Sequence, residues 1–281
     1  MSIAIYLCVI LCLFFFPEYT AATARDALEI WASDIIPTLF PYMVFCRLLC
    51  GKLRGLPIPS VPAAALLGLM GGSPSGAAVI SSYRSRISAR ALCALCALTG
   101  TISPMFLLGT VPAWIHMPEL GPVLLISHWI GAAFSAVCAF AAFRRFPVDM
   151  PVECSDSNVS DSSALAQSVD AILQVGGCIV CCSVAAGMAA KLVSFQHITG
   201  AFVHGLLEIS GGMHAVFSTC TTVNFKYLSA AALCGFTSLS ILAQNYAVLR
   251  PLGIRFQQLF AFACLRAIGS AAAMAVFLHI R

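Results

Sequence analysis

One acidic residue, Glu208, stands in the middle of an apolar run, AFVHGLLEISGGMHAVF. An ionised carboxylate costs at least about 2.5 kcal/mol to place inside a bilayer, so such a residue usually faces a cavity or a partner. His204 precedes Glu208 by four residues and therefore shares its helix face. We expect this pair to couple proton movement to substrate contact. The alternative is a protonated or hydrogen-bonded Glu208 that closes a helix interface.

Hydroxyl, amide, glycine and proline residues interrupt two other apolar runs, LLGLMGGSPSGAAVISSY at 66–83 and ALCGFTSLSILAQNY at 232–246. Irregular backbone at membrane depth is tolerated only beside protein or water, so each interruption predicts a polar cavity. Half-helix N-termini present free N–H groups and partial positive charge, which suit an anionic substrate. Close helix packing is the alternative use of glycine and serine in membranes. The substrate-binding residues that we expect are Ser73, Pro74, Ser75, Gly76, Thr101, Ser103, Glu208, Thr237, Ser238, Ser240 and Gln244.

Neither a metal site nor a catalytic site is expected. Two cysteine groups, at 93–96 and 178–182, have C-x-x-C spacing, but nearly all of the 14 cysteines lie in apolar runs, where cysteine acts as a small hydrophobe. No histidine or second pair is positioned to complete a zinc site. His204, Glu208 and His214 also lack a further ligand. Without paired carboxylates, H-E-x-x-H or a Ser/His/Asp order, we expect no enzyme, no metal and no cofactor.

The composition is that of a membrane protein. Of 281 residues, 60% are hydrophobic and 9% are charged, with a mean hydropathy of +0.95. Soluble domains carry roughly 25% charged residues. The net charge of +4 comes from basic residues at segment ends, which set topology rather than bind nucleic acid. We expect an all-α, polytopic transmembrane helical bundle with apolar segments near 3–16, 35–50, 61–83, 91–111, 121–143, 169–190, 198–217, 228–249 and 258–280.

A polar, serine-rich stretch at 144–168 divides this bundle and predicts a flexible linker. Residues 1–30 are expected to form an N-terminal transmembrane helix and a loop. Residues 31–143 and 169–281 are expected to form two structurally repeated halves, each with a broken or re-entrant helix. The repeat pairs the interruption at 72–76 with the one at 235–238, and paired discontinuities of this kind indicate a transport site.

Basic residues bear on how the broken segments lie. They flank 61–83 on both sides, at 47–54 and 84–90, so the positive-inside rule predicts a re-entrant hairpin there. Single basic residues around the second interruption leave the relative orientation of the halves open. The sequence Ala22-Thr23-Ala24 suits signal-peptide cleavage, but no positively charged n-region precedes the first segment, so we expect that helix to be retained.

Five segments, in order and spacing, resemble the sporulation integral membrane family YlbJ (SpoVV), whose members carry a nucleoside-recognition "gate" domain. They are DIIPTLFPYMVFCRLL, GLMGGSPSGAAVISSYRSR, LTGTISPMFLLGTV, GLLEISGG and GFTSLSILAQ. The resemblance implies a transporter-like protein of endospore-forming bacteria that moves dipicolinic acid toward the forespore. The chain departs from the family pattern at Ser73, Ala78 and Leu242, where tyrosine, lysine and histidine are usual.

We therefore expect a transporter or permease for a small, anionic metabolite. The competing function is a non-transporting scaffold that assembles other sporulation membrane proteins. The expected partners are the substrate and the lipid bilayer, with a second copy of the chain (a homo-oligomer) or other sporulation membrane proteins as further candidates, and no nucleic acid. The expected location is the cell membrane or the outer forespore membrane, as a multi-pass integral protein.

Overall fold

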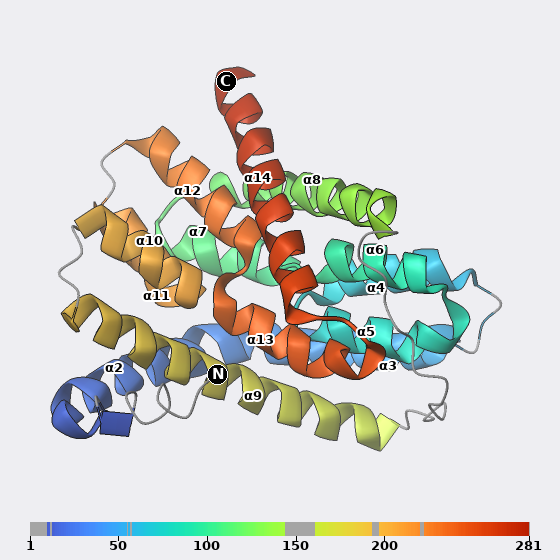
Figure 1. The fold of residues 1–281 in the computed structure, drawn as a ribbon, viewed down its shortest axis with the longest axis horizontal. Helices are drawn as coiled ribbons and strands as arrows, with labels where there is room; N and C mark the ends of the chain where they lie inside the picture. Colours follow the sequence, from blue (N-terminus) through green and yellow to red (C-terminus); the bar gives the residue numbers. More distant parts are fainter. Residues whose placement is uncertain are drawn as a thin grey trace.

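The computed structural model describes residues 10–143 and 161–280, apart from residues 12, 55, 57, 193–196 and 220–221. Within these residues the regular elements are all helices (Figure 1). The stretches long and apolar enough to cross a membrane are Pro17–Leu53, Leu120–Ala141, Ser163–Lys191, Val223–Leu252 and Phe256–Ile280. The all-α, polytopic helical bundle predicted from the sequence is confirmed.

The first half opens with one long helical stretch. It runs from α2 (Pro17–Ile30) through a π-helical turn, η1 (Trp31–Ile35), into α3 (Ile36–Arg54). Residues 17–30 are therefore helical, and the loop expected before residue 31 is wrong. The run stays helical although Pro41 lies inside α3, where it removes one backbone N–H donor. Pro17 sits in the first turn of α2, where its missing N–H is tolerated.

A helical hairpin follows. It consists of α4 (Ser60–Gly71) and α5 (Ser75–Tyr83), and residues 72–74 form its turn. Gly72 has a φ of 60°, and a Cβ atom there would lie 2.5 Å from the backbone nitrogen of Ser103, so only glycine fits.

The next helix is broken. After a 3-10 turn, η2 (Arg84–Arg86), α6 (Ala89–Thr99) ends in an irregular segment at 100–103. The chain then continues through a π-helical turn, η3 (Phe106–Thr110), into the short α7 (Val111–Trp114). The long α8 (Leu120–Ala141) completes the first half.

The second half repeats this order of elements. After α9 (Asp161–Leu192), a second hairpin pairs α10 (His197–Leu207) with α11 (Ile209–Thr219), and Glu208 lies at the junction. The broken helix that follows consists of α12 (Val223–Phe236) and α13 (Ser238–Leu249), separated by Thr237. A 3-10 turn, η5 (Arg250–Leu252), leads to the long α14 (Phe256–Ile280).

The two hairpins enter the molecule from opposite ends, and both turns lie near its centre (Figure 1). Within the molecule, the two halves are therefore inverted relative to one another. The pairing of interruptions changes as well. The hairpin at 60–83 corresponds by order to the hairpin at 197–219, and the break at 100–103 corresponds to the break at Thr237.

The boundary of the second half also moves. The predicted linker at 144–168 falls partly outside the described residues, at 144–160. Its remainder, residues 161–168, is helical, because α9 begins at Asp161. The predicted linker is therefore too long by about two helical turns.

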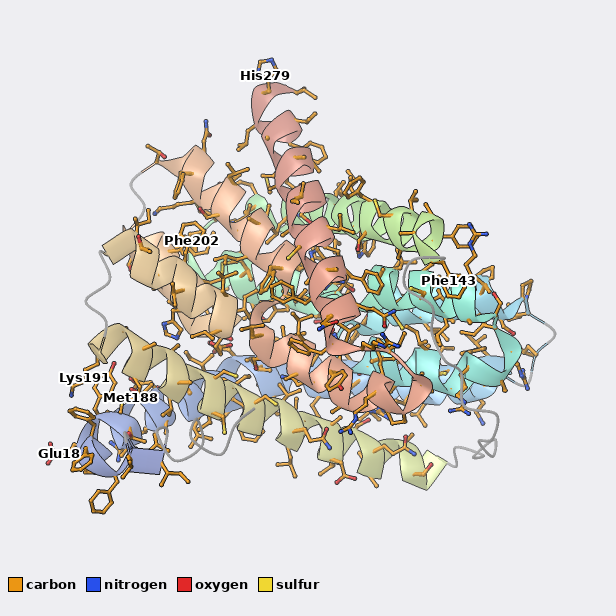
Figure 2. The ribbon with its side chains drawn as sticks, in the orientation of Figure 1. Glu18, Phe143, Met188, Lys191, Phe202 and His279 are labelled. Atoms are coloured by element: carbon orange, nitrogen blue, oxygen red, sulfur yellow. The ribbon has the colours of Figure 1, made fainter. Side chains whose placement is uncertain are left out.

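The N-terminal helix packs against the second half. The Tyr19 hydroxyl donates a hydrogen bond to the carbonyl of Gly187 (3.1 Å), and Trp31 Nε1 donates to the carbonyl of Ile172 (3.2 Å). Figure 2 shows Lys191 beside this helix, and its ammonium lies 4.7 Å from the ring centroid of Tyr19. These contacts fix α2 along α9, although the two helices lie more than 130 residues apart in sequence.

Candidate functional site

A cavity lies where the interrupted segments of both halves meet. About 50 Å³ of it is open to the centres of water-sized atoms, which corresponds to about four water molecules. Apolar side chains form most of its wall, and Glu208 contributes the ionisable group among the lining residues. The cavity is lined by Ile35, Thr38, Leu39, Ser73, Ile102, Ser103, Phe106, Val175, Ile179, Glu208, Ile209, Ser210, Ser240, Ile241 and Gln244.

Ser73 and Ser103 bring the two interruptions of the first half to the cavity. The backbone N–H of Ser73 donates to the carbonyl of Thr101 (2.7 Å), which ties the hairpin turn to the broken helix. The Ser73 hydroxyl accepts a hydrogen bond from Asn245 Nδ2 (2.8 Å). The Ser103 hydroxyl accepts from the backbone N–H of Phe106 (3.3 Å) and so caps the helical turn that begins at Pro104 and leads into η3. Each hydroxyl still carries its own O–H donor.

Glu208 lies at the turn of the second hairpin, and its side chain is almost fully buried. One carboxylate oxygen accepts from the backbone N–H of Ser210 (2.9 Å), and the other accepts from that of Gly211 (2.8 Å). These N–H groups belong to the first turn of α11, where no carbonyl of the same helix can reach them. Glu208 therefore caps the N-terminus of α11 while it faces the cavity.

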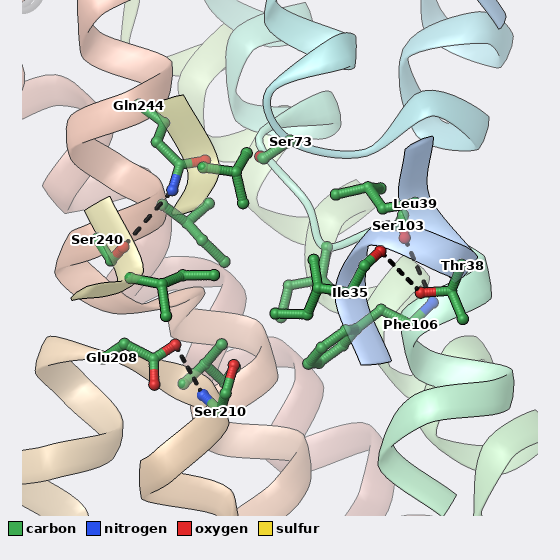
Figure 3. A pocket seen from close by; sticks show the side chains of 15 residues that line it. Ile35, Thr38, Leu39, Ser73, Ser103, Phe106, Glu208, Ser210, Ser240 and Gln244 are labelled. Carbon is green, nitrogen blue, oxygen red and sulfur yellow. Dashed lines mark hydrogen bonds between the residues drawn. The ribbon is translucent and has the colours of Figure 1, made fainter. Parts of the chain in front are cut away.

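The second broken helix contributes Ser240 and Gln244 to the cavity, and these two residues lie one turn apart on α13. Gln244 Nε2 donates to the Ser240 hydroxyl at 3.5 Å. Figure 3 shows both residues on the same side of the cavity as Glu208 and opposite Thr38, Ser103 and Phe106. The first turn of α13 is set by Thr237 and Ser238, whose φ angles are 71° and 65°. The break thus redirects the chain so that one face of α13 reaches the cavity.

Five of the predicted binding residues meet at this cavity: Ser73, Ser103, Glu208, Ser240 and Gln244. The other six do not line it, although they belong to the same breaks. They are Pro74, Ser75, Gly76, Thr101, Thr237 and Ser238. Their part is to shape the breaks. Gly76, for example, lets the hairpin close, because a Cβ there would lie 2.7 Å from the carbonyl oxygen of Gly68.

His204 and Glu208 do not share a hydrogen bond. The Nε2 atom of His204 is buried without a hydrogen-bond partner and lies against Gly211. The contact between the two residues is made by the backbone, where the N–H of Glu208 donates to the carbonyl of His204 (2.7 Å). Direct proton exchange between these side chains needs a rearrangement or a bridging water.

In the described part of the chain, no three His, Cys, Asp or Glu side chains gather as metal ligands.

Arg266 is a functional candidate that the sequence interpretation missed. It lies in the middle of α14 and is 1% exposed. Its guanidinium donates to the carbonyls of Ala97 (3.1 Å) and Gly235 (3.3 Å) and to the hydroxyl of Thr237 (3.2 Å). The two carbonyls belong to the last turns of α6 and α12, where partial negative charge gathers. One cation therefore bridges the broken helices of both halves.

His128 is a second missed residue, buried at the centre of α8. Its Nε2 accepts a hydrogen bond from the backbone N–H of Ile102 (3.2 Å), in the break that follows α6. The sequence contains a feature that could have identified both residues. The rule that singled out Glu208, a polar group inside an apolar run, applies equally to Arg266 and His128.

The sequence is similar to one curated protein with a stated role. It is 22% identical, over 305 aligned residues, to the sporulation integral membrane protein YlbJ of Bacillus subtilis (strain 168). The match covers 87% of this chain and 74% of that protein. No protein-family model matches the chain. No solved structure matches it either. The resemblance to YlbJ drawn from the five motifs is thus confirmed as a distant similarity, and the chain is a multi-pass integral membrane protein.

Proposed function

We propose that this protein moves a small metabolite across a membrane during sporulation, and that the substrate binds in the cavity between the two halves. The observation that carries the proposal is the cavity itself, because both hairpin turns and both broken helices contribute to it. Paired discontinuities of this kind recur at the binding sites of secondary transporters. The sporulation role is taken from the name of the YlbJ relative.

An anionic substrate is the finer part of this proposal. The hydroxyls of Ser73 and Ser103 each accept one internal hydrogen bond, so their O–H groups remain to donate to a ligand. Both lie near helix N-termini, at α5 and η3, where the helix dipole favours negative charge. Glu208 lies across the cavity and uses both carboxylate oxygens to cap α11. A carboxylate-bearing substrate such as dipicolinic acid would then bind on the Ser73–Ser103 side.

We further propose that both hairpins are re-entrant, each entering and leaving the membrane on one side. The first is preceded and followed by basic residues at 47–52 and 84–90, which favour the same compartment. The proton-coupling role of Glu208 belongs to the same proposal, because a buried carboxylate beside a substrate anion would favour binding of a proton.

Uptake into proteoliposomes tests the function. Purified protein is reconstituted and supplied with labelled dipicolinic acid, and Ser73→Ala combined with Ser103→Ala is compared with Ser218→Ala. Ser218 is an exposed hydroxyl on α11 that bonds its own helix and provides the control. Loss of two hydrogen bonds to a charged ligand, at about 1.5–3 kcal/mol each, should lower uptake at least tenfold. The control should transport as the wild type does.

A deletion strain separates transport from the scaffold alternative. Spores that lack the gene are complemented with the wild type or the double variant, and their dipicolinic acid is measured. Equal rescue by both proteins, together with no uptake by wild-type proteoliposomes, would refute the transport proposal and favour a scaffold.

A further inference from the structure

A second cavity lies away from the breaks, between α3, α5 and α9. About 40 Å³ of it is open to the centres of water-sized atoms, enough for about three water molecules. Its residues come from three helices that are distant in sequence. They are Arg47, Cys50, Gly51, Ala78, Val79, Ser82 and Gln167. None of them lines the cavity described above, so any ligand here is separate from the substrate.

Arg47 is the charged residue of this cavity, and its donors are only partly used. Its Nη1 donates to the side-chain oxygen of Gln167 (2.9 Å). Its Nε is buried and has no hydrogen-bond partner. A guanidinium keeps its charge and offers five N–H donors in a fixed plane. A buried donor of this kind is costly to leave unpaired, so the site favours a ligand that brings an acceptor.

Gln167 adds donors from the facing helix. Its amide oxygen already accepts from Arg47, so its NH₂ group points its two N–H donors elsewhere. The Ser82 hydroxyl donates to the carbonyl of Val79 (2.7 Å) and lies 3.4 Å from the thiol sulfur of Cys50. The groups that remain for a ligand are therefore donors on α3 and α9. Such a set fits a tetrahedral oxyanion, whose oxygens all accept hydrogen bonds.

Most of the charged side chains around this cavity are also basic. This end of the molecule holds the end of α3, the hairpin entrance, the start of α6 and the turn after α13. The basic residues at these positions are Lys52, Arg84, Arg86, Arg90, Arg250 and Arg255. Asp170 on α9 is the acidic side chain that acts on Arg47. Figure 2 places Phe143, at the end of α8, at this same end, opposite Lys191.

We propose that Arg47 and Gln167 form a binding site for a phosphate group. The nearest source of this group is the headgroup of an anionic phospholipid, because basic pockets between helices at the cytoplasmic face of a membrane take such headgroups. Free inorganic phosphate offers the same chemistry. Occupancy joins α3 of the first half to α9 of the second through one ligand, in addition to the direct Arg47–Gln167 bond.

Lipid retention tests the site and its source. The full chain is purified in detergent, incubated with phosphatidylglycerol or phosphatidylcholine, and examined by native mass spectrometry. A second arm adds inorganic phosphate and follows thermal unfolding. The variants are Arg47→Gln and, as the matched control, Lys52→Gln. Lys52 is an exposed cation on the same helix that does not line the cavity.

The wild type and Lys52→Gln should retain phosphatidylglycerol in preference to phosphatidylcholine. Arg47→Gln should retain it about tenfold less, as expected for one lost charged hydrogen bond of at least about 1.4 kcal/mol. Retention of phosphatidylglycerol without thermal stabilisation by inorganic phosphate assigns the site to lipid, and thermal stabilisation by inorganic phosphate as well assigns it to the free anion. Equal retention by Arg47→Gln and Lys52→Gln, or no preference in the wild type, overturns the proposal. If Arg47→Gln does not fold, the proposal is tested instead by lipid retention in Arg47→Lys and by the effect of inorganic phosphate on thermal unfolding of the wild type.

Discussion

The buried guanidinium of Arg266 can be removed with little change in side-chain volume by Arg266→Met. The variant keeps the apolar stem of the residue but loses the donors that reach Ala97 and Gly235. Both acceptors are carbonyls in the last turns of helices, so no N–H of their own helix is placed to replace the guanidinium. The substitution therefore leaves two buried acceptors unpaired at the centre of the molecule.

The cost follows from these two carbonyls. A buried acceptor without a partner costs about 1–3 kcal/mol, so the variant should lose about 2–6 kcal/mol of stability. Removal of the buried charge offsets part of this loss, because a desolvated cation is itself unfavourable. We therefore expect the lower part of the range. At roughly 2 °C per kcal/mol for a chain of this size, the melting temperature should fall by at least about 4 °C.

Buried thiols provide the assay. Cys50, Cys93, Cys96 and Cys234 are buried, so a thiol-reactive fluorophore reports their exposure as the protein unfolds in detergent. Arg90→Met is the matched control, because Arg90 also donates to a carbonyl, that of Phe140 at 3.0 Å, but does so at the surface. The control should shift the transition by less than about half as much. An Arg266→Met transition equal to that of the control would refute the bridging role.

Three further outcomes are expected. Gly72→Ala should prevent accumulation of folded protein, measured as the monodisperse fraction in gel filtration, because its Cβ would meet the backbone of Ser103. Glu208→Gln should remain folded but lose transport activity and the dependence of transport on pH. An amide has one acceptor oxygen, so it can cap only one of the two N–H groups, and it cannot titrate. Normal uptake by this variant across pH would show that the carboxylate is purely structural. Cysteines introduced by Ser60→Cys and Ser88→Cys should react with an impermeant maleimide from one side of the membrane, and Thr222→Cys should react from the other; labelling of all three from one side would contradict the inverted arrangement.

The sequence was informative about where the chain breaks and less so about how the breaks pair. Glycine, serine and proline between residues 71 and 76 marked the first hairpin turn, because only certain residues tolerate that backbone. Glu208 was singled out by its charge, but its position at a hairpin turn was hidden. The apolar run around it reads as one continuous helix, and a carboxylate that caps a helix looks the same in sequence as one that lines a pore.

The features that the sequence did not predict depend on tertiary contacts. Arg266 stabilises two helix ends that are 138 residues apart, and no local pattern reports such a bond. The start of α9 was missed for the opposite reason. Residues 161–168 are polar enough to resemble the linker before them, although they are helical and join a long apolar helix that packs in the core. Composition indicates that such a segment meets water but not whether it is ordered.

The break between α12 and α13 has an energetic consequence. Thr237 and Ser238 both hold left-handed backbone angles, which cost about 1–2 kcal/mol for each residue that carries a side chain. The break therefore stores elastic energy of roughly 2–4 kcal/mol, and the bond from Arg266 to the Thr237 hydroxyl helps to hold it. If the hydrogen bond between Arg266 and Thr237 breaks, refolding of this turn into continuous helix would release that energy. Glycine at either position would relieve the strain in place and so keep the helix broken.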